Sequence, residues 1–325
     1  MPSGPMMAAE RKPDWLKVRP PGGENFSHLK TLLGGLNLHT VCEEAHCPNV
    51  GECWTGGTAT IMLLGDTCTR GCRFCAVTSG NPGAVVDAGE PERVARALAE
   101  MDLAYVVLTM VDRDDLPDGG AAHVARTLRE IRARCPGLLV ETLVGDFAGH
   151  RRDVEALIEG GAPDVFAHNV EVVPRLQRQM RDARCSWARS LDVLRWAREA
   201  GMRVTKSSLM VGCGETDDEV FLALEALRAT DIDVVTIGQY LRPTPKHAPV
   251  ARFVEPATFD AYRERGEALG FRFVASGPLV RSSYRAAEAF MRGVLAPAEA
   301  PAHDRYGHPR GPRHKRRLQI VEGLN

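Results

Sequence analysis

Apolar and polar residues follow one another along this chain in blocks of two lengths. Short, almost wholly apolar runs, such as ATIMLLG at 59–65 and AYVVLTM at 104–110, have the length of buried strands. Longer amphipathic stretches lie between them, and in PERVARALAEM at 91–101 the residues Val94, Leu98 and Met101 recur at helical spacing. The same reasoning predicts strands over 138–144, 164–170, 202–212, 233–241 and 271–277, and helices over 26–36, 119–135, 151–161, 190–201, 216–230 and 256–270.

Strand and helix alternate about six times in this pattern. Strands that are apolar throughout are typical of parallel strands covered by helices on both faces. We therefore predict an α/β fold, a partial parallel (β/α)6-type TIM-like barrel with N-terminal and C-terminal extensions. An open doubly wound sheet is the alternative. In a parallel barrel the functional groups lie at the C-terminal ends of the strands.

The expected organisation has three parts. Residues 1–58 form an extension rich in Pro, Gly and polar groups, 59–275 the barrel, and 276–325 a closing segment whose basic stretch at 305–317 we expect to be disordered. The N-terminus lacks the apolar region of a secretory signal, and no apolar run approaches the roughly 20 residues of a membrane span. We expect a cytoplasmic protein that binds no membrane.

Charge and cysteine content reduce the number of function classes that fit this sequence. The 41 basic and 42 acidic residues give a formal charge of -1, which does not favour nucleic acid as a partner. Six of the nine cysteines fall within residues 42–75. In a chain without a secretory signal, such a cluster indicates metal ligation and not a disulfide framework.

The most informative cysteines are Cys68, Cys72 and Cys75, in CTRGCRFC directly after the first expected strand. Three thiolates on one loop can hold three irons of a 4Fe–4S cube and leave the fourth iron open to a small molecule. A zinc knuckle is the alternative, although zinc sites more often show C-x2-C pairs. The spacing C-x3-C-x2-C, with Phe74 before the last cysteine, resembles the signature of radical S-adenosylmethionine enzymes.

A second set, spaced C-x4-C-x5-C, consists of Cys42, Cys47 and Cys53. Alone it fits a structural zinc site equally well, but beside the first set it indicates two metal centres of different function. The remaining cysteines are isolated in the sequence. We predict no role for them because small buried cysteines are common; they are Cys135, Cys185 and Cys213.

From about Trp15 to Ala286 the chain resembles the lipoyl synthase family of radical S-adenosylmethionine enzymes. The resemblance is carried by CEEAHCPNVGECW, GDTCTRGCRFCAV, VDRDDLPDGG, HNVEVVPRL, TIGQYLRPTPKH and RSSYRA. Three positions depart from the family pattern: Met110 stands for a usual Ser, Ser208 for a Gly and Cys213 for a Leu. The last two would alter the pocket floor beside the adenosine.

The resemblance implies two 4Fe–4S clusters. Cys68, Cys72 and Cys75 would hold a reducing cluster whose open iron binds S-adenosylmethionine, which is cleaved to a 5′-deoxyadenosyl radical. The second cysteine set would hold an auxiliary cluster that donates sulfur, with Ser283 as its fourth ligand and Ser282 as the alternative. A serine oxygen is a harder ligand than a thiolate, which suits a cluster that must come apart.

The implied substrate is an octanoyl chain on a lysine of a lipoyl carrier domain, in 2-oxoacid dehydrogenase complexes or the glycine cleavage H protein. Sulfur would enter at C6 and C8, with two S-adenosylmethionine molecules per lipoyl group. A low-potential electron donor and cluster-assembly or carrier proteins would be further partners. The alternatives are sulfur insertion into a free small molecule, as in biotin synthase, and a zinc-stabilised binding protein.

Several residues are weaker candidates. Asn169 and Glu171 end an expected strand, where they can contact the cofactor or cap a helix, and Glu215 lies near the adenosine or in an ordinary N-cap. The four acids of VDRDDLPDGG, at 111–120, either hold the cofactor or carrier or form a solvated charge run.

Three cations and a histidine complete the set. Arg242 and Lys246 are candidates for ion pairs across the active face and for attraction of an acidic carrier. Arg281 contacts the auxiliary site or substrate, or merely fastens the C-terminal segment. We interpret His168 as a core histidine whose hydrogen bonds are satisfied.

Overall fold

The computed structural model describes residues 11–18, 21–45, 47–55, 60–101 and 103–283. The basic stretch at 305–317 lies outside them. Within the described residues, one eight-stranded sheet has its strands in the order β1-β2-β5-β6-β7-β8-β9-β10. Its strands are β1 (His39–Thr40), β2 (Thr60–Leu63), β5 (Tyr105–Met110), β6 (Leu139–Leu143), β7 (Val165–Ala167), β8 (Thr205–Val211), β9 (Val234–Gln239) and β10 (Phe273–Gly277).

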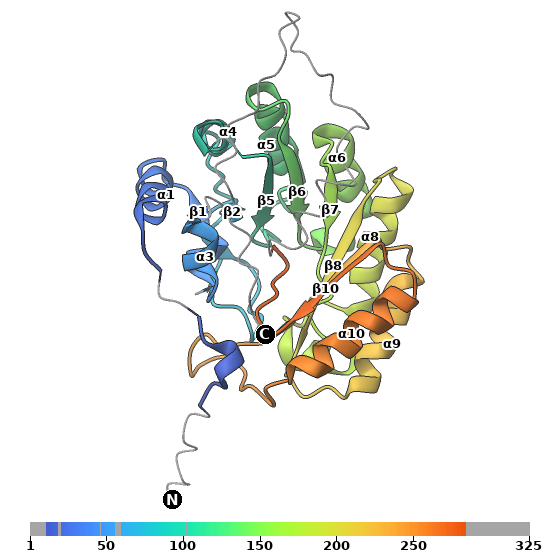
Figure 1. The fold of residues 1–325 in the computed structure, drawn as a ribbon. Helices are drawn as coiled ribbons and strands as arrows, with labels where there is room; N and C mark the ends of the chain where they lie inside the picture. Colours follow the sequence, from blue (N-terminus) through green and yellow to red (C-terminus); the bar gives the residue numbers. More distant parts are fainter. Residues whose placement is uncertain (1–10, 19–20, 46, 56–59, 102, 284–325) are drawn as a thin grey trace, which may run out of the picture.

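The sheet is the predicted partial barrel. From β2 to β10 each strand of this sheet pairs in parallel with the sheet's next strand along the chain, and the strands curve around a common interior (Figure 1). A doubly wound sheet reverses its strand order partway, so that alternative is wrong. The sequence pattern missed β1, a short strand of the N-terminal extension that pairs antiparallel with β2 through His39 and Met62.

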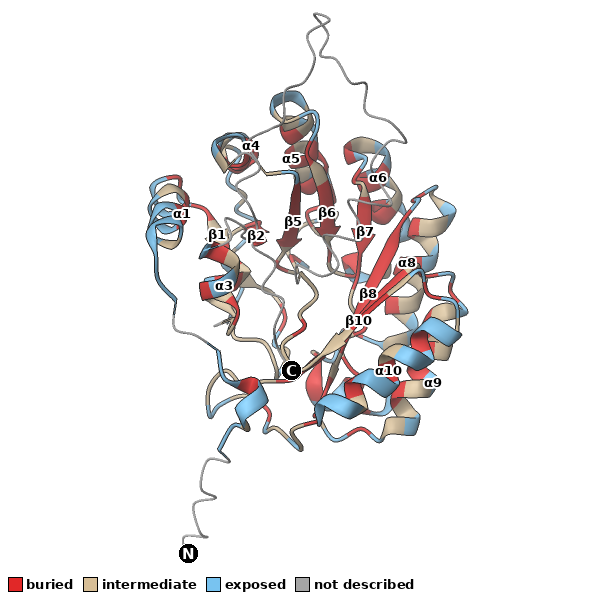
Figure 2. Cartoon of the chain, in the orientation of Figure 1, coloured by how far each residue is buried: buried red, intermediate tan, exposed pale blue. Residues whose placement is uncertain are grey.

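Helices follow the strands and cover the outer face of the sheet (Figure 1). Figure 2 shows the strands as largely buried, while each helix turns an exposed side to solvent. All six predicted barrel helices are present. They are α4 (Glu90–Met101), α5 (Ala121–Arg134), α6 (Arg151–Gly161), α8 (Trp187–Glu199), α9 (Asp217–Arg228) and α10 (Pro256–Ala268), with the short α7 (Gln177–Met180), η2 (Phe147–Gly149) and η3 (Pro174–Leu176) between them.

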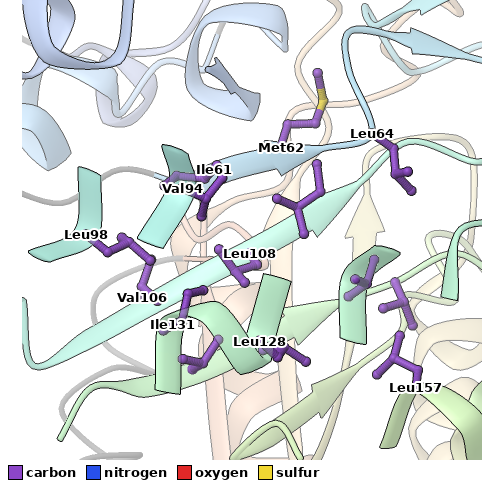
Figure 3. Packing of buried hydrophobic residues seen from close by; sticks show 14 of the residues in the cluster. Ile61, Met62, Leu64, Val94, Leu98, Val106, Leu108, Leu128, Ile131 and Leu157 are labelled. Atoms are coloured by element: carbon purple, nitrogen blue, oxygen red, sulfur yellow. The ribbon is translucent and has the colours of Figure 1, made fainter. Parts of the chain in front are cut away.

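Alternate strand residues face the helices and the interior. Figure 3 shows Ile61 and Val106 packed toward Val94 and Leu98 of α4, in the main hydrophobic core. The inward residues form a separate buried cluster at the N-terminal ends of the strands, with members Tyr105, Val107, Val165, Val204 and Val234.

A buried ion pair lies beside this inner cluster. Lys206 Nζ donates to Glu141 Oε1 at 2.7 Å, and the Tyr105 hydroxyl donates to the same carboxylate. All three side chains are at least nine-tenths buried, so the pair fills the closed end of the barrel and leaves the opposite end for the site.

The N-terminal extension packs on the β2 side of the barrel. It contains η1 (Asp14–Leu16), α1 (Glu24–Gly35), α2 (Val41–Glu44) and α3 (Val50–Thr55). Trp54 is fully buried, and its ring lies 5.0 Å from that of Phe26, centroid to centroid. The predicted helix at 26–36 is confirmed. In the described residues, no helix combines the length and apolar character that crossing a membrane requires.

Candidate active site

A cavity of about 440 Å³ opens at the C-terminal ends of the barrel strands. Cysteines of both sets and the C-terminal serine line it, although they are far apart in the sequence. The candidate residues on its wall are Cys47, Cys68, Cys72, Cys75, Asp112, His168, Asn169, Glu171, Arg242, Arg281, Ser282 and Ser283. All nine cysteines are free of disulfides. In the part of the chain described, no three His, Cys, Asp or Glu side chains converge as they would around a single metal ion.

The loop of the first cysteine set lies between β3 (Thr67–Cys68) and β4 (Thr78–Ser79). On one side, the Thr69 N–H donates to the Asp112 carbonyl at 2.9 Å, just beyond β5. The Gly71 N–H donates to Asp182 Oδ2 at 2.9 Å, and the Arg73 N–H donates to the Met180 carbonyl at 2.8 Å. The loops after β5 and β7 therefore fix the path of the cysteine loop.

The loop after β9 holds the other side. The Ala248 N–H donates to the Arg73 carbonyl at 2.9 Å, and His247 Nε2 donates to the Cys75 carbonyl at 2.9 Å. Because the peptide groups of the cysteine loop bond to three separate strand-end loops, its three sulfurs have defined positions before any ligand binds.

Arg70 lies between the first two cysteines, and its side chain anchors the loop through salt bridges. Its side chain is 1% exposed and makes salt bridges to Asp114 at 2.8 Å and Asp146 at 2.6 Å, with Asp112 3.6 Å away. A buried guanidinium needs such compensation. The carboxylates come from the loops after β5 and β6, so this network adds the end of β6 to the strand ends that hold the cysteine loop.

The sulfurs of the first set suit thiolate ligation. A backbone N–H donates to each: that of Arg70 to Cys68 at 3.4 Å, that of Asp182 to Cys72 at 3.3 Å, and that of Val77 to Cys75. Such donors favour a charged sulfur. Burial opposes them and raises the pKa of Cys75 to about 11. A metal group that takes these thiolates must therefore displace their protons.

The acids of 111–120 make ion pairs and hydrogen bonds within the protein. Asp114 and Asp112 pair with Arg70, while Asp115 accepts two hydrogen bonds from the buried Arg113 guanidinium. Asp118 accepts the Ala122 N–H in the first turn of α5. The run is therefore more than a solvated charge cluster, because its carboxylates have partners within the protein. Burial raises the pKa of Asp112, which lines the cavity, to about 6.

The second cysteine set lies on and between α2 and α3. Cys42 is buried, which raises the pKa of its thiol to about 11. The Trp54 indole nitrogen is a buried donor without a hydrogen-bond partner among the described residues, and it acts to lower the pKa of Cys42. Cys47 lines the cavity and Cys53 lies on α3. A buried N–H facing a cysteine is a donor suited to a thiolate ligand.

The C-terminal segment reaches the same place from the far end of the chain. It crosses β9 so closely that a Cβ added to Gly238 would lie 2.0 Å from the Val280 carbonyl oxygen. Arg281 donates back to the Val280 carbonyl at 2.6 Å, and its charge interacts with Cys47. Ser282 and Ser283 follow on the cavity wall. The hydrogen bonds of Arg281 therefore stay within its own segment, while its charge acts on Cys47 of the second cysteine set.

The three predicted cofactor contacts lie in two places. Asn169 and Glu171 line the cavity and bond to each other, and Glu171 has φ +67°, a strained conformation for a residue with a side chain. Glu215 lies outside the cavity lining. Its buried carboxylate accepts the N–H groups of Gly212 at 2.6 Å and Cys213 at 2.9 Å, which fixes the turn before α9.

The remaining candidates divide between loop and core. Arg242 donates to the His247 carbonyl at 2.8 Å and to the Pro245 carbonyl, so it braces its own loop. Lys246 is exposed on that loop. His168 is a satisfied core histidine, as predicted: its ring nitrogens lie 2.8 Å from the Val144 carbonyl and 3.0 Å from Ser190 Oγ.

Sequence reasoning missed four residues that support the site. Asp146 follows the third parallel strand, a position that marks functional groups, but a single Asp there is a weak signal. Arg70 occupies a variable position of the cysteine motif, and His247 belongs to a stretch chosen for its cations. Cys185 was given no role, yet it lines the cavity beside Arg70, 3.3 Å from its Nη1.

Comparison with known proteins agrees with this geometry. Residues 62–227 match the Radical SAM superfamily, and residues 5–47 match the N-terminal domain of lipoyl synthase of that family. The chain is 60% identical to the lipoyl synthase of Sorangium cellulosum over 299 residues, covering 87% of this chain and 80% of the relative. It is 54% identical to the lipoyl synthase of Anaeromyxobacter dehalogenans over 292 residues, covering 90% of this chain and 99% of the relative.

Solved structures support the fold alone. HydG, a maturase of the [FeFe]-hydrogenase, superimposes with a TM-score of 0.52 at 14% identity, covering 80% of this chain and 57% of that one. The sequence relatives carry the functional assignment, since both are more than half identical over most of their length. The chain therefore belongs to the lipoyl synthase family and is a radical S-adenosylmethionine enzyme.

Proposed function

We propose that this chain inserts two sulfur atoms, at C6 and C8, into an octanoyl chain bound to a carrier protein. Cys68, Cys72 and Cys75 hold a reducing 4Fe–4S cluster. The second cysteine set holds an auxiliary 4Fe–4S cluster that is the sulfur source, with Ser283 as its fourth ligand. The observation that supports the proposal is that one cavity is lined by the whole first cysteine set, by Cys47 of the second set and by Ser283.

The chemistry explains why both sets must reach one cavity. When bound, the reducing cluster and S-adenosylmethionine supply a 5′-deoxyadenosyl radical. An unactivated methylene offers no proton that a side-chain base can remove, so no catalytic acid–base pair is required. The substrate carbon radical must react with sulfur before it reacts with any other group. A sulfur donor on the wall of the same cavity lies close enough for that.

The chain's own residues bind and orient S-adenosylmethionine and enclose the alkyl chain of the substrate. Asn169 and Glu171 present an amide and a carboxylate to the cavity, where they can receive the polar end of S-adenosylmethionine. Apolar residues on the same wall, Met110, Leu143 and Val280 among them, suit an alkyl chain and exclude water from it. Glu215 acts at a distance from the cofactor by fixing the turn at Gly212 and Cys213.

Two variants test the division of labour. Cys68→Ala should abolish S-adenosylmethionine cleavage, because the reducing cluster loses a ligand. Cys47→Ala should retain cleavage and lose sulfur insertion. Cys135→Ala, a cysteine on the outer side of the barrel after α5, is the matched control and should retain both activities. Equal loss of cleavage in folded Cys68→Ala and Cys47→Ala would contradict the proposal.

The choice of substrate has its own test. A carrier-bound chain requires that an octanoylated peptide be converted and that free octanoate be left unchanged. Conversion of free octanoate alone would favour the biotin-synthase-like alternative. Two S-adenosylmethionine molecules consumed per lipoyl group, a low-potential electron donor, cluster-assembly or carrier proteins, and a cytoplasmic location remain predictions of the same proposal.

A further inference from the structure

The mouth of the cavity is marked by positive charge. Most residues of the lining are buried or half-buried, and the two that are exposed to solvent are Lys12 and Arg242. Lys12 belongs to the N-terminal extension, and Arg242 to the loop after β9, which also carries the exposed Lys246. Within the described residues, the lysines that form ion pairs are Lys17 and Lys206, so Lys12 and Lys246 keep their charge available to a partner.

The segment on the Lys12 side of the mouth, residues 11–18, has a fixed position. Leu16 is 2% exposed, and its N–H donates to the Pro13 carbonyl at 3.1 Å, which closes the turn η1. Further along, Pro21 runs so close to α3 that a Cβ added to Gly51 would lie 2.8 Å from the Pro21 Cα. Figure 1 shows η1, in dark blue, at the end of the molecule toward which the barrel strands point. The segment is therefore a defined rim of the open end of the barrel.

Two large apolar side chains of this segment are exposed to solvent. Trp15 is 39% exposed and Val18 is 43% exposed. In the rest of the described chain the large apolar residues that are exposed are Val85 and Leu222. One exposed apolar residue is ordinary on a protein surface, but half of these four lie in one short segment at the cavity mouth. Tryptophan is also one of the residue types that most often anchor protein–protein interfaces.

The chemistry of the substrate indicates what covers this surface. An octanoyl chain on a protein-bound lysine can enter the cavity only if the protein surface around that lysine comes against the rim. Cations on the rim attract a partner that carries acidic residues around the modified lysine. The exposed Trp15 beside them requires an apolar contact on the same partner.

We propose that residues 11–18, together with the loop after β9, form the docking surface for the carrier domain. Trp15 is its apolar anchor, and Lys12 and Lys246 attract the partner. The occupant is a folded, acidic domain that presents the octanoylated lysine. This inference rests on the proposed function, because it requires a substrate that is borne by a protein.

The test compares two substrates in anaerobic turnover by the full chain. One is an octanoylated lipoyl carrier domain, and the other is a short octanoylated peptide without acidic residues. Trp15→Ala should raise the apparent KM for the domain about tenfold, and Val18→Ala should raise it less. Both variants should convert the peptide as the wild type does, because the peptide has no surface for the anchor to contact. Leu222→Ala, an exposed apolar position on α9, is the matched control and should change neither substrate.

A charge variant tests the second part of the surface. Lys12→Glu should raise the apparent KM for the carrier domain at low salt. The effect should shrink at high salt, because salt shortens the Debye length below about 8–10 Å. Lys30→Glu, at an exposed position on α1, is its control and should leave the KM for the domain unchanged.

Three results would overturn the inference while the proposed function stood. An unchanged KM for the domain in Trp15→Ala and Lys12→Glu would show that the segment does not dock it. An equal loss with domain and peptide in Trp15→Ala would mean that the segment only shapes the cavity. A wild-type dimer that dissociates in Trp15→Ala during analytical ultracentrifugation, with unchanged carrier kinetics, would assign the surface to a second copy of the chain. If the wild type converted neither substrate, the proposed function would fall and this inference with it.

Discussion

The Asn49 side-chain amide donates a hydrogen bond of 2.8 Å to the Leu279 carbonyl oxygen, 230 positions further along the chain. Asn49 is 3% exposed and lies between Cys47 and Cys53. Leu279 lies four positions before Ser283. One buried hydrogen bond therefore joins the stretch of the second cysteine set to the segment that carries the serine.

Asn49→Ala should weaken this connection. The Leu279 carbonyl loses its donor, which costs about 1–3 kcal/mol if the group stays buried. We expect the C-terminal segment to loosen locally, because the barrel's own hydrogen bonds do not involve Asn49. Trypsin cleavage after Arg281 should accelerate, sulfur insertion should fall several-fold, and S-adenosylmethionine cleavage should persist.

A matched control is available in the same extension. The Asn25 amide donates to the Thr55 carbonyl at 2.9 Å, in an exposed position away from the C-terminal segment. Asn25→Ala should leave trypsin cleavage after Arg281 and sulfur insertion at wild-type levels. If Asn49→Ala behaved like Asn25→Ala, the hydrogen bond from Asn49 to the Leu279 carbonyl would not contribute to sulfur insertion.

The barrel was predictable from the sequence because its signals are local. Apolar runs of strand length and helical spacing, as in Val94 and Leu98, are imposed by the layer that each element occupies. The strand β1 was not predictable in this way, since two residues carry no periodicity. Its pairing with β2 depends on how the extension packs around Trp54.

The candidate site was predictable where chemistry needs rare residues at short spacing, as in the loop of Cys68, Cys72 and Cys75. Its support was not. Arg70, Asp146 and Cys185 meet only because three strand ends converge, and their separation in sequence conceals the contact. An isolated cysteine such as Cys185 is chemically ambiguous until its neighbours are known.

We expect His168 to make the stability of the protein depend on pH. Burial, followed by the charge of Arg181, lowers its pKa from 6.5 to about 4. A depressed folded-state pKa means that its stabilisation is fully present above the unfolded pKa of 6.5 and is lost as the pH falls toward 4. Between pH 7 and pH 5 this group should remove about 2 kcal/mol from the free energy of unfolding.

Urea unfolding at the two pH values measures this contribution. His168→Gln should be less stable at pH 7 and show a smaller loss on going to pH 5. His28→Gln, at an exposed position on α1, should follow the wild type. An unaltered pH dependence in His168→Gln would mean that another group titrates.

The loop after β9 carries two cations, Lys246 and Arg242, for which we expect different functions. Both side chains are exposed, but Arg242 donates to the His247 carbonyl and so braces the loop that holds the Cys75 carbonyl through His247. Lys246→Glu should raise the apparent KM for an acidic octanoylated carrier and leave S-adenosylmethionine cleavage intact without carrier. The effect should shrink as salt shortens the Debye length below about 8–10 Å.

Arg242→Glu should differ, because it disturbs the support of the cysteine loop. We expect it to lower S-adenosylmethionine cleavage as well as carrier turnover. Steady-state kinetics at low and high salt separate the two variants. An unchanged KM for Lys246→Glu at low salt would exclude this patch as a carrier site.

Ser283→Cys addresses the proposed sulfur source. A thiolate is a softer ligand than a serine oxygen and should hold iron more firmly. Cluster loading and radical generation should survive, since the first cysteine set is untouched. Release of the first sulfur should slow or stop. Ser282→Cys, the neighbouring change on the same cavity wall, is the control.

The measurement is the amount of thiooctanoyl peptide formed per 5′-deoxyadenosine in an anaerobic single turnover with an octanoylated peptide. Wild type and Ser282→Cys should give coupled product, whereas Ser283→Cys should give 5′-deoxyadenosine with little or no thiolated peptide. Uncoupling in Ser282→Cys alone would move the ligand to Ser282. Wild-type coupling in both variants would contradict a serine-ligated cluster as the source of the inserted sulfur.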